Sequence, residues 1–267
     1  MSKKPKVLVL RTAGTNCDQE TAAAFEASGA SVDRVHINQL LAGAQHAVPL
    51  QDYHILAIPG GFTYGDDIES GRILANELRL HLGEKIAKFI ADGKLIIGIC
   101  NGFQVLVRAH ILPGLHGTNE SKQTATLTNN DSGKFEDRWI TLKPEGKSVW
   151  TQGLEECVYF PVAHAEGKFI ADKSVVDQLN KNGQVTFRYC KADGSPPQYP
   201  ENPNGSMEHI AGITDKTGRI LGLMPHPERH FYFHHHPHWS RMEKTSKLGQ
   251  GARIFQNGVD YIKETFL

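Results

Sequence analysis

The sequence contains only four cysteines in 267 residues, and it lacks the paired cysteines of a typical zinc site. Cys17, Cys100, Cys157 and Cys190 lie far apart, and none belongs to a Cys-x-x-Cys pair. Disulfide-rich folds and cysteine zinc sites depend on such pairing, so the sequence predicts neither. Free thiols are typical of a reducing compartment, and we therefore expect a cytoplasmic protein.

The chain also lacks net charge and long hydrophobic runs. Lys plus Arg and Asp plus Glu number 29 each, without a basic block, so no nucleic acid is expected as a partner. The first apolar run, Val7–Leu10, is too short for a signal-peptide core or a membrane span, so no membrane association is expected. A Gly-x-x-x-x-Gly-Lys-Ser/Thr loop is missing as well, so we expect no nucleotide site on this chain.

The first half of the chain alternates apolar runs with helical patterns. Four short runs have the composition of buried strands: Lys6–Leu10, Ser31–Ile37, His54–Ile58 and Leu95–Ile99. Helical patterns separate them, with Asp18 expected to cap the first helix over Gln19–Ser28 and a long helix expected over Leu74–Ala91. Such β-α-β units predict an α/β fold whose doubly wound, mostly parallel sheet is flanked by helices.

The second half predicts an antiparallel extension of that sheet. Strand-like runs occur at Trp139–Leu142, Val158–Val162 and Gln184–Tyr189, and Ile210–Asp215 with Ile220–Met224 forms a hairpin pattern. The stretch Leu112–Lys143 shows weak periodicity and gives no clear placement. Gly251–Phe266 predicts a closing helix that buries Ala252, Phe255, Val259 and Ile262. The length favours one domain over residues 1–267.

A cysteine between two glycines, at the end of an apolar run, is the main chemical signal. Leu95–Ile99 leads into Cys100, and Gly98 and Gly102 bracket it as Gly-x-Cys-x-Gly. A strand that turns sharply into a helix strains the residue at the apex and leaves its side chain available. Backbone N–H groups at the start of that helix favour a thiolate. Cys100 is thus a candidate nucleophile, with a buried, inert cysteine as the alternative.

Two further segments could complete a site. Pro59–Asp67 follows a predicted strand, and its glycines can aim N–H groups at a bound atom, although alone it would be an ordinary glycine turn. His226 and Glu228 are two residues apart, so in an extended segment the carboxylate can lie beside the imidazole. A nucleophilic cysteine needs such a base and a group that orients it. A charged surface turn is the alternative for this pair.

Several sequence blocks together resemble one known family. The chain is similar to the glutaminase subunits of phosphoribosylformylglycinamidine synthase, also called formylglycinamide ribonucleotide amidotransferase, in the class I glutamine amidotransferase family. The Cys-His-Glu set alone resembles any class I glutamine amidotransferase domain. The other blocks resemble the member of that family that acts in purine biosynthesis. The blocks cover most of the chain in order: Asn16–Asp18, Pro59–Asp66, Gly98–Leu106, His164–Phe169, Asn202–Ser206 and Met224–Arg229.

This resemblance implies a flavodoxin-like glutaminase fold and hydrolysis of L-glutamine through a cysteine thioester. It implies Cys100 as the nucleophile, His226 as acid and base, and Glu228 as the orienting group. It further implies an oxyanion hole from the N–H groups of Gly61 and Asn101, and glutamine contacts by Gly60 and Gln104. Ammonia would pass to a larger synthase subunit, which uses ATP and Mg and can also bind a small accessory subunit, for purine biosynthesis.

Alternative functions stay open at this level. Other cysteine hydrolases and chaperone-like proteins of the same α/β superfamily would share the elbow but commonly lack the late His-x-Glu turn. A catalytically silent scaffold would keep the fold and only bind a partner. The histidine-rich run His230–Trp239 has no regular ligand spacing, so we expect no metal there, and its role is open.

Overall fold

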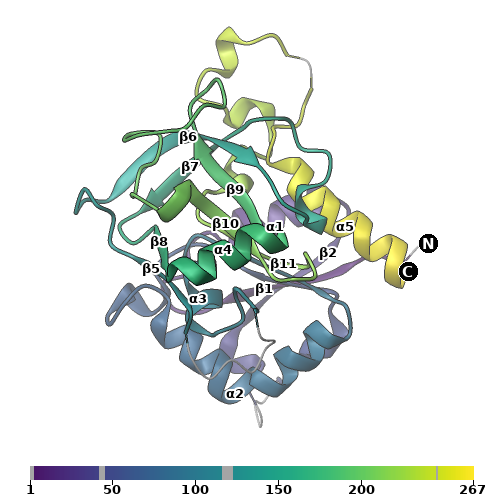
Figure 1. Cartoon of the computed structure of the whole chain (residues 1–267). Helices are drawn as coiled ribbons and strands as arrows, with labels where there is room; N and C mark the ends of the chain where they lie inside the picture. Colours follow the sequence, from purple (N-terminus) through teal and green to yellow (C-terminus); the bar gives the residue numbers. More distant parts are fainter. Residues whose placement is uncertain (1–2, 42–45, 116–122, 245) are drawn as a thin grey trace.

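The computed structural model describes residues 3–41, 46–115, 123–244 and 246–267 (Figure 1). Its first half contains β1 (Lys6–Arg11), α1 (Asp18–Ala27), β2 (Ser31–His36), β3 (Ile55–Ile58), α2 (Arg72–Ala91), β4 (Leu95–Ile99) and α3 (Asn101–Arg108). All residues of β3 and β4 are buried, as expected of strands covered on both faces. These elements confirm the strands and helices predicted for this half.

The second half is mostly strands. It contains β5 (Ala125–Thr128), β6 (Glu136–Pro144), β7 (Val158–His164), β8 (Lys168–Ala171), α4 (Lys173–Asn182), β9 (Val185–Cys190), β10 (Ile210–Thr214), β11 (Ile220–Leu223) and α5 (Ala252–Phe266). The hairpin and the closing helix are confirmed. Within the stretch that the sequence left unplaced, β5 and all of β6 except Pro144 are now defined, and residues 116–122 lie outside the described residues.

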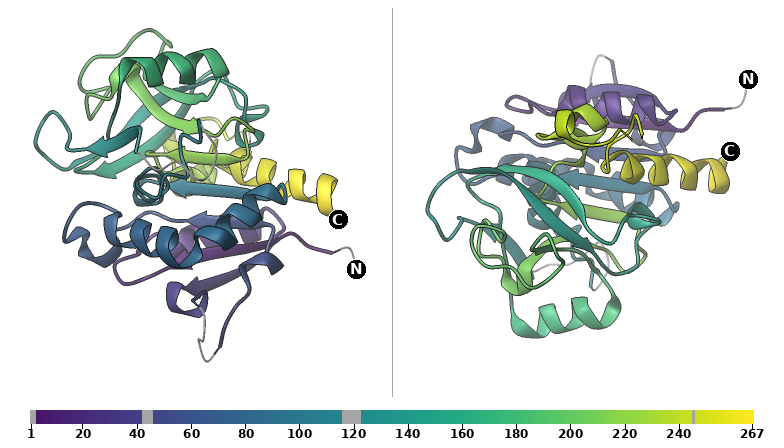
Figure 2. Two further views of the ribbon diagram at one scale, coloured as in Figure 1. Left: turned by 60° about the horizontal axis from the view of Figure 1, so that its bottom comes forward. Right: turned by 90° about the horizontal axis from the view of Figure 1, so that it is seen from above.

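One nine-stranded sheet joins the two halves, in the order β2-β1-β3-β4-β11-β10-β9-β6-β7. Neighbours from β2 to β11 run parallel, and the pairs from β11 to β7 run antiparallel, which confirms the doubly wound sheet and its extension. The connection from β1 through α1 to β2 and the connection from β3 through α2 to β4 run in opposite directions across the sheet. Because both crossovers are right-handed, α1 and α2 lie on opposite faces of the sheet. In the left view of Figure 2, α2 lies in front of the strands and α5 behind them.

Asp18 does not cap α1, so that prediction is wrong. Cys17 occupies the N-cap position without a side-chain cap hydrogen bond, and Asp18 is the first helical residue. Its carboxylate instead lies 3.3 Å from Nη1 of Arg34 and 3.8 Å from Nε of Arg11. These two cations on neighbouring strands draw the carboxylate away from the helix end. An acid in the first turn still interacts favourably with the helix dipole.

The buried apolar residues form one cluster that spans both halves. Phe25 of α1 and Phe255 of α5 pack edge to face with ring centroids 5.0 Å apart. Asn257 of α5 donates to the carbonyl of Trp150 at 3.0 Å, and the Trp150 indole donates to the carbonyl of Arg219 at 3.0 Å. Because the sheet and this core are continuous, we propose that the chain folds as one domain. Among the described residues, no helix has the length and apolarity needed to cross a membrane.

Candidate active site

Cys100 forms a strained turn between β4 and α3. Its φ of 52° and ψ of −106° lie in a region that residues with a side chain rarely adopt. The N–H of Cys100 donates to the carbonyl of Leu223 at 2.7 Å, which fastens the turn to β11. A Cβ at Gly98 would lie 2.5 Å from the carbonyl oxygen of Gly102, and one at Gly102 would lie 1.9 Å from that of Ile58. Both positions therefore require glycine, and the predicted nucleophile elbow is present.

His226 and Glu228 form a buried pair at the end of β11. Nδ1 of His226 lies 2.6 Å from Oε1 of Glu228, and each residue is 2% exposed. Because β11 pairs with β4 in parallel, residues that follow the two strands meet at one edge of the sheet. This pairing places His226 near Cys100. The N–H of His226 also donates to the carbonyl of Pro161 at 2.9 Å, which holds the turn against β7.

The electrostatics of His226 favour its protonated form. Burial lowers the pKa of His226, but the Glu228 carboxylate and the neighbouring Cys100 thiol outweigh that effect, and its pKa is raised well above the usual value of 6.5. The expected extended backbone is wrong, since Pro227–His230 forms a 3₁₀ turn. The two side chains meet nevertheless, because the tight turn brings Glu228 back beside the imidazole.

Gly60 lies where the catalytic candidates converge. A Cβ at this position would be 2.7 Å from Cε1 of His226, 3.2 Å from Sγ of Cys17 and 3.4 Å from Cβ of Cys100. Gly60 thus leaves open the space between the two thiols and the imidazole. The carbonyl of Gly60 accepts from the N–H of Cys17 at 3.2 Å, so the glycine loop and the start of α1 are held together.

The neighbouring Gly61 has a φ of 143°, and a Cβ there would lie 2.8 Å from the carbonyl oxygen of Gly14. The N–H of Phe62 donates to this same carbonyl at 2.9 Å. The loop from β3 is therefore fixed against the loop after β1. Asn101 begins α3, so its N–H lacks an acceptor within the helix, as an oxyanion donor requires.

Side chains connect this loop with α3 and with the connection after β7. The hydroxyl of Thr63 donates to Oδ1 of Asn101 at 2.8 Å, and Nδ2 of Asn101 donates to Oε1 of Gln104 at 3.0 Å. Gln104 then donates to the carbonyl of Glu166. Gln104 is 3% exposed, so its amide anchors the Glu166 segment, and a glutamine contact by Gln104 stays a prediction.

The sequence model of one protein family, the CobB/CobQ-like glutamine amidotransferase domain, matches residues 4–262 of this chain. The chain belongs to this family. Relatives include the phosphoribosylformylglycinamidine synthase subunit PurQ of Dehalococcoides mccartyi, 48% identical over 98% of this chain and 99% of the relative. The PurQ subunit of Methanococcus maripaludis is 41% identical over 97% of this chain and 98% of the relative.

A solved structure of PurLQS from Thermotoga maritima is similar as well. The matching chain has 31% identity and a TM-score of 0.72, and the match covers 97% of this glutamine amidotransferase and 100% of that chain. A further glutamine amidotransferase of Thermotoga maritima has 13% identity and a TM-score of 0.57, over 99% of this chain and 100% of that chain, and shares the fold. The predicted family and fold are confirmed.

Sequence reasoning gave no role to Cys17 and His164, which lie close to His226 of the candidate triad. Cys17 contributes to the raised pKa of His226, and Nη2 of Arg229 lies 3.1 Å from Sγ of Cys17. His164 is buried, and burial together with the charge of His226 lowers the pKa of His164 to about 3. The blocks Asn16–Asp18 and His164–Phe169 named these residues, but no local pattern shows that their side chains approach residue 226.

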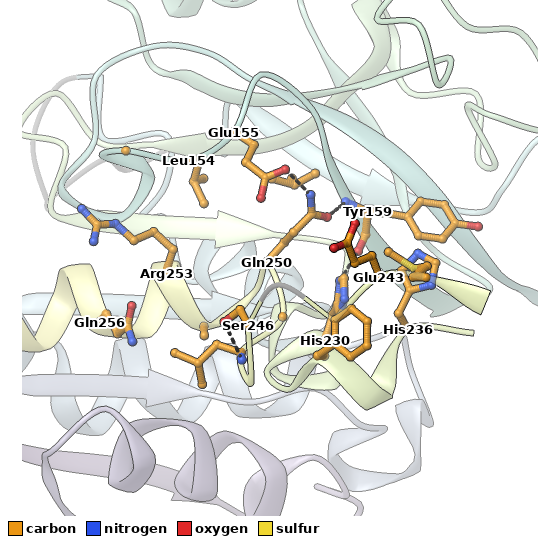
Figure 3. Close-up of a pocket in the computed structure, with 17 residues that line it drawn as sticks. Leu154, Glu155, Tyr159, His230, His236, Glu243, Ser246, Gln250, Arg253 and Gln256 are labelled. Carbon is orange, nitrogen blue, oxygen red and sulfur yellow. Dashed lines mark hydrogen bonds between the residues drawn. The ribbon is translucent and has the colours of Figure 1, made fainter. Parts of the chain in front are cut away.

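The histidine-rich run borders a separate pocket of about 510 Å³ (Figure 3). His230 and His236 line it together with Gln250, just before α5, and Arg253, in the first turn of α5. Gln250 accepts from the N–H of Tyr159 at 2.8 Å. Cys100, His226 and Glu228 are not among the lining residues. In the described part of the chain, the histidines of this run do not form a group with metal-ligand spacing.

Proposed function

We propose that Cys100, His226 and Glu228 carry out the glutaminase reaction of this chain. The chain is the glutaminase subunit of phosphoribosylformylglycinamidine synthase and hydrolyses L-glutamine for purine biosynthesis. The observation that carries the residue assignment is the buried His226–Glu228 contact of 2.6 Å, next to the strained elbow of Cys100. A surface turn would not keep both side chains 2% exposed.

The reaction begins when His226 takes the thiol proton of Cys100 and the sulfur attacks the carbonyl carbon of the glutamine side-chain amide. The N–H groups of Gly61 and Asn101 stabilise the oxyanion that forms. His226 gives a proton to the amide nitrogen, the C–N bond breaks, and ammonia leaves a glutamyl thioester. His226 then takes a proton from water, which attacks the thioester. The C–S bond breaks, glutamate is released, and His226 returns the proton to the Cys100 sulfur. Glu228 holds the imidazole and stabilises its positive form.

Ammonia from this reaction goes to a larger synthase subunit, which converts formylglycinamide ribonucleotide into the amidine. The similarity to a chain of the solved PurLQS structure from Thermotoga maritima supports a complex of this kind. We assign ATP and Mg to the synthase subunit, and no cofactor to this chain. The small accessory subunit is a further partner of the complex. We place the complex in the cytoplasm, where purine precursors are made and thiols stay reduced.

The deciding experiment replaces the elbow thiol. Cys100→Ala should abolish glutamate release in the presence of the synthase subunit, while glutamine binding and the circular dichroism spectrum persist. Cys157→Ala serves as the matched control, because Cys157 is a free cysteine outside the triad and should leave turnover unchanged. A diazo ketone analogue of glutamine should label Cys100 stoichiometrically by mass spectrometry. Full turnover by Cys100→Ala would refute the mechanism.

A further inference from the structure

The side chain of Asn101 joins the two segments that carry the proposed oxyanion donors. Its Oδ1 accepts from the hydroxyl of Thr63 at 2.8 Å and from the N–H of Thr63 at 3.4 Å. Thr63 is two residues after Gly61 in the loop that follows β3, whereas Asn101 is the first residue of α3. Asn101 thus supplies one proposed donor by its own backbone N–H, and its side chain holds the loop that carries the other.

The same side chain also contacts the far end of that loop. Nδ2 of Asn101 donates to Oδ1 of Asp66 at 3.3 Å and to Oε1 of Gln104 at 3.0 Å. A backbone N–H can only donate and an ionised carboxylate can only accept, so Thr63 and Asp66 fix which way the Asn101 amide points. Asn101 is 1% exposed and Thr63 is 3% exposed, so water does not compete for these contacts.

The backbone between the two contact points is strained. Tyr64, Gly65 and Asp66 have φ values of 55°, 73° and 54°, which residues with a side chain rarely adopt. Such conformations persist only where the surrounding contacts over-determine them. On one side, the N–H of Tyr64 donates to the carbonyl of Ala13 at 2.8 Å. Asn101 provides contacts on the α3 side, so the loop would relax away from α3 without them.

We propose that the Thr63–Asn101 contact sets the distance between the two oxyanion donors. Such a donor is effective only when its N–H is aimed at the place where charge develops in the transition state. Thr63 and the Asn101 side chain are therefore positioning residues, whose loss slows the chemical step and leaves glutamine binding nearly unchanged. The effect on turnover rests on the proposed function, whereas the fastening of the loop does not.

Substitution of Thr63 tests this in the complex with the synthase subunit. Thr63→Val removes the hydroxyl and keeps the shape of the side chain, whereas Thr63→Ser keeps the hydroxyl. We expect kcat for glutamate release to fall about 10- to 100-fold in Thr63→Val, with KM for glutamine near the wild-type value. Thr63→Ser should stay close to the wild type. Thr186→Val is the matched control, because Thr186 is buried in β9 and its hydroxyl has no hydrogen-bond partner among the described residues.

A double-mutant cycle shows whether the two side chains act as one unit. Asn101→Ala keeps the backbone N–H of residue 101 and should lower kcat at least as far as Thr63→Val. The double variant should be no slower than Asn101→Ala alone, because the contact is already lost. Independent effects that multiply would overturn the proposal, and so would a fall in kcat that Thr63→Ser or Thr186→Val shares. Circular dichroism checks that each variant is folded.

Hydrogen exchange separates this inference from the proposed function. The amide groups of residues 62–66 should exchange at least about tenfold faster in Thr63→Val and Asn101→Ala than in the wild type. Thr63→Ser and Thr186→Val should exchange at wild-type rates. Unchanged exchange in Thr63→Val would overturn the fastening of the loop, with or without activity. Absence of glutaminase in the wild-type complex would instead refute the proposed function.

Discussion

Glu228 is the single residue that most affects His226 in the proposed mechanism. Its carboxylate raises the pKa of His226 against the effect of burial. We predict that Glu228→Gln lowers glutaminase turnover by about 10²–10⁴-fold, since the amide carries no charge and permits the wrong imidazole tautomer. The pH–rate profile of the variant should also shift to lower pH. Glu20→Gln is the control, because Glu20 pairs with Arg229 outside the triad, and its profile should match the wild type.

The buried imidazole of His230 should make the free energy of unfolding depend on pH in the acid range. Burial lowers the pKa of His230 to about 4, and its Nδ1 donates to the carbonyl of Tyr159 at 2.7 Å. The folded state therefore binds a proton less readily than the unfolded chain, whose histidines titrate near 6.5. Above pH 6.5 the titration of His230 does not change the free energy of unfolding. As the pH drops from about 6.5 to about 4, the unfolded chain takes up the proton first, and the free energy of unfolding falls. The nearby His235 and His236 add positive charge when protonated and act in the same direction.

Urea unfolding at pH 7 and pH 5 measures this effect. The wild type should lose about 2 kcal/mol more of its free energy of unfolding over that interval than His230→Gln, which cannot titrate. The exposed His81, replaced by Gln, is the control and should behave as the wild type. An identical loss in His230→Gln and the wild type would contradict the assignment.

At the scale of elements, the approach of α3 to β3 decides the geometry of the elbow. Gly102 touches the backbone of β3 so closely that a Cβ would lie 1.9 Å from the carbonyl of Ile58. We predict that Gly102→Ala lowers the free energy of unfolding by at least about 1–3 kcal/mol and removes glutaminase activity, because α3 must shift and carry Cys100 with it. Chemical denaturation and glutamate release measure the two effects.

Gly83 in α2 is a matched control for that helix substitution. A Cβ at Gly83 would meet no atom within 4 Å, so Gly83→Ala relieves the entropic cost of glycine in a helix. We expect this control to stabilise the chain by up to about 1 kcal/mol and to leave turnover unchanged. If Gly102→Ala were equally harmless, the steric account of the elbow would be wrong.

At the scale of the whole molecule, exposed aromatic residues lie in or beside the Pro59–Asp67 loop, which carries the proposed oxyanion donor Gly61. Phe62 is 44% exposed and Phe135 is 49% exposed, and their rings stack with centroids 6.3 Å apart. Phe62 directly follows Gly61, so contact with this pair can reposition the N–H group that we propose as an oxyanion donor. We predict that glutaminase activity of the isolated chain is low and rises when the synthase subunit binds, because the partner orders this loop.

A pair of variants tests this coupling. Phe62→Ser should reduce the activation by the synthase subunit, with little change in the activity of the isolated chain. Leu80→Ser is the control, because Leu80 is 69% exposed on α2, and it should leave activation intact. Glutamate release is measured with and without the synthase subunit. Equal turnover in both conditions for the wild type would contradict partner activation.

The sequence by itself determined the strands and helices of the first half, the hairpin, the closing helix and the local elbow, but not β5, β8 or α4. Buried strands such as β4 are continuous apolar runs, and the bracket of Gly98 and Gly102 marks a turn that only small residues permit. These features depend on residues close in sequence. Asp18 is the exception. Its carboxylate pairs with Arg11 and Arg34, which only the fold brings near, and it does not cap the helix.

Only the tertiary structure decided which distant groups share the site. Cys17, Cys100 and His226 meet around Gly60 because parallel strands align their carboxyl ends at one edge of the sheet. The resemblance supplied the triad, but no pattern in the chain placed Cys17 beside His226. Spacing in sequence does not encode distances between separate strands. The fold sets these distances, so the place of the second thiol near the imidazole came from the structure alone.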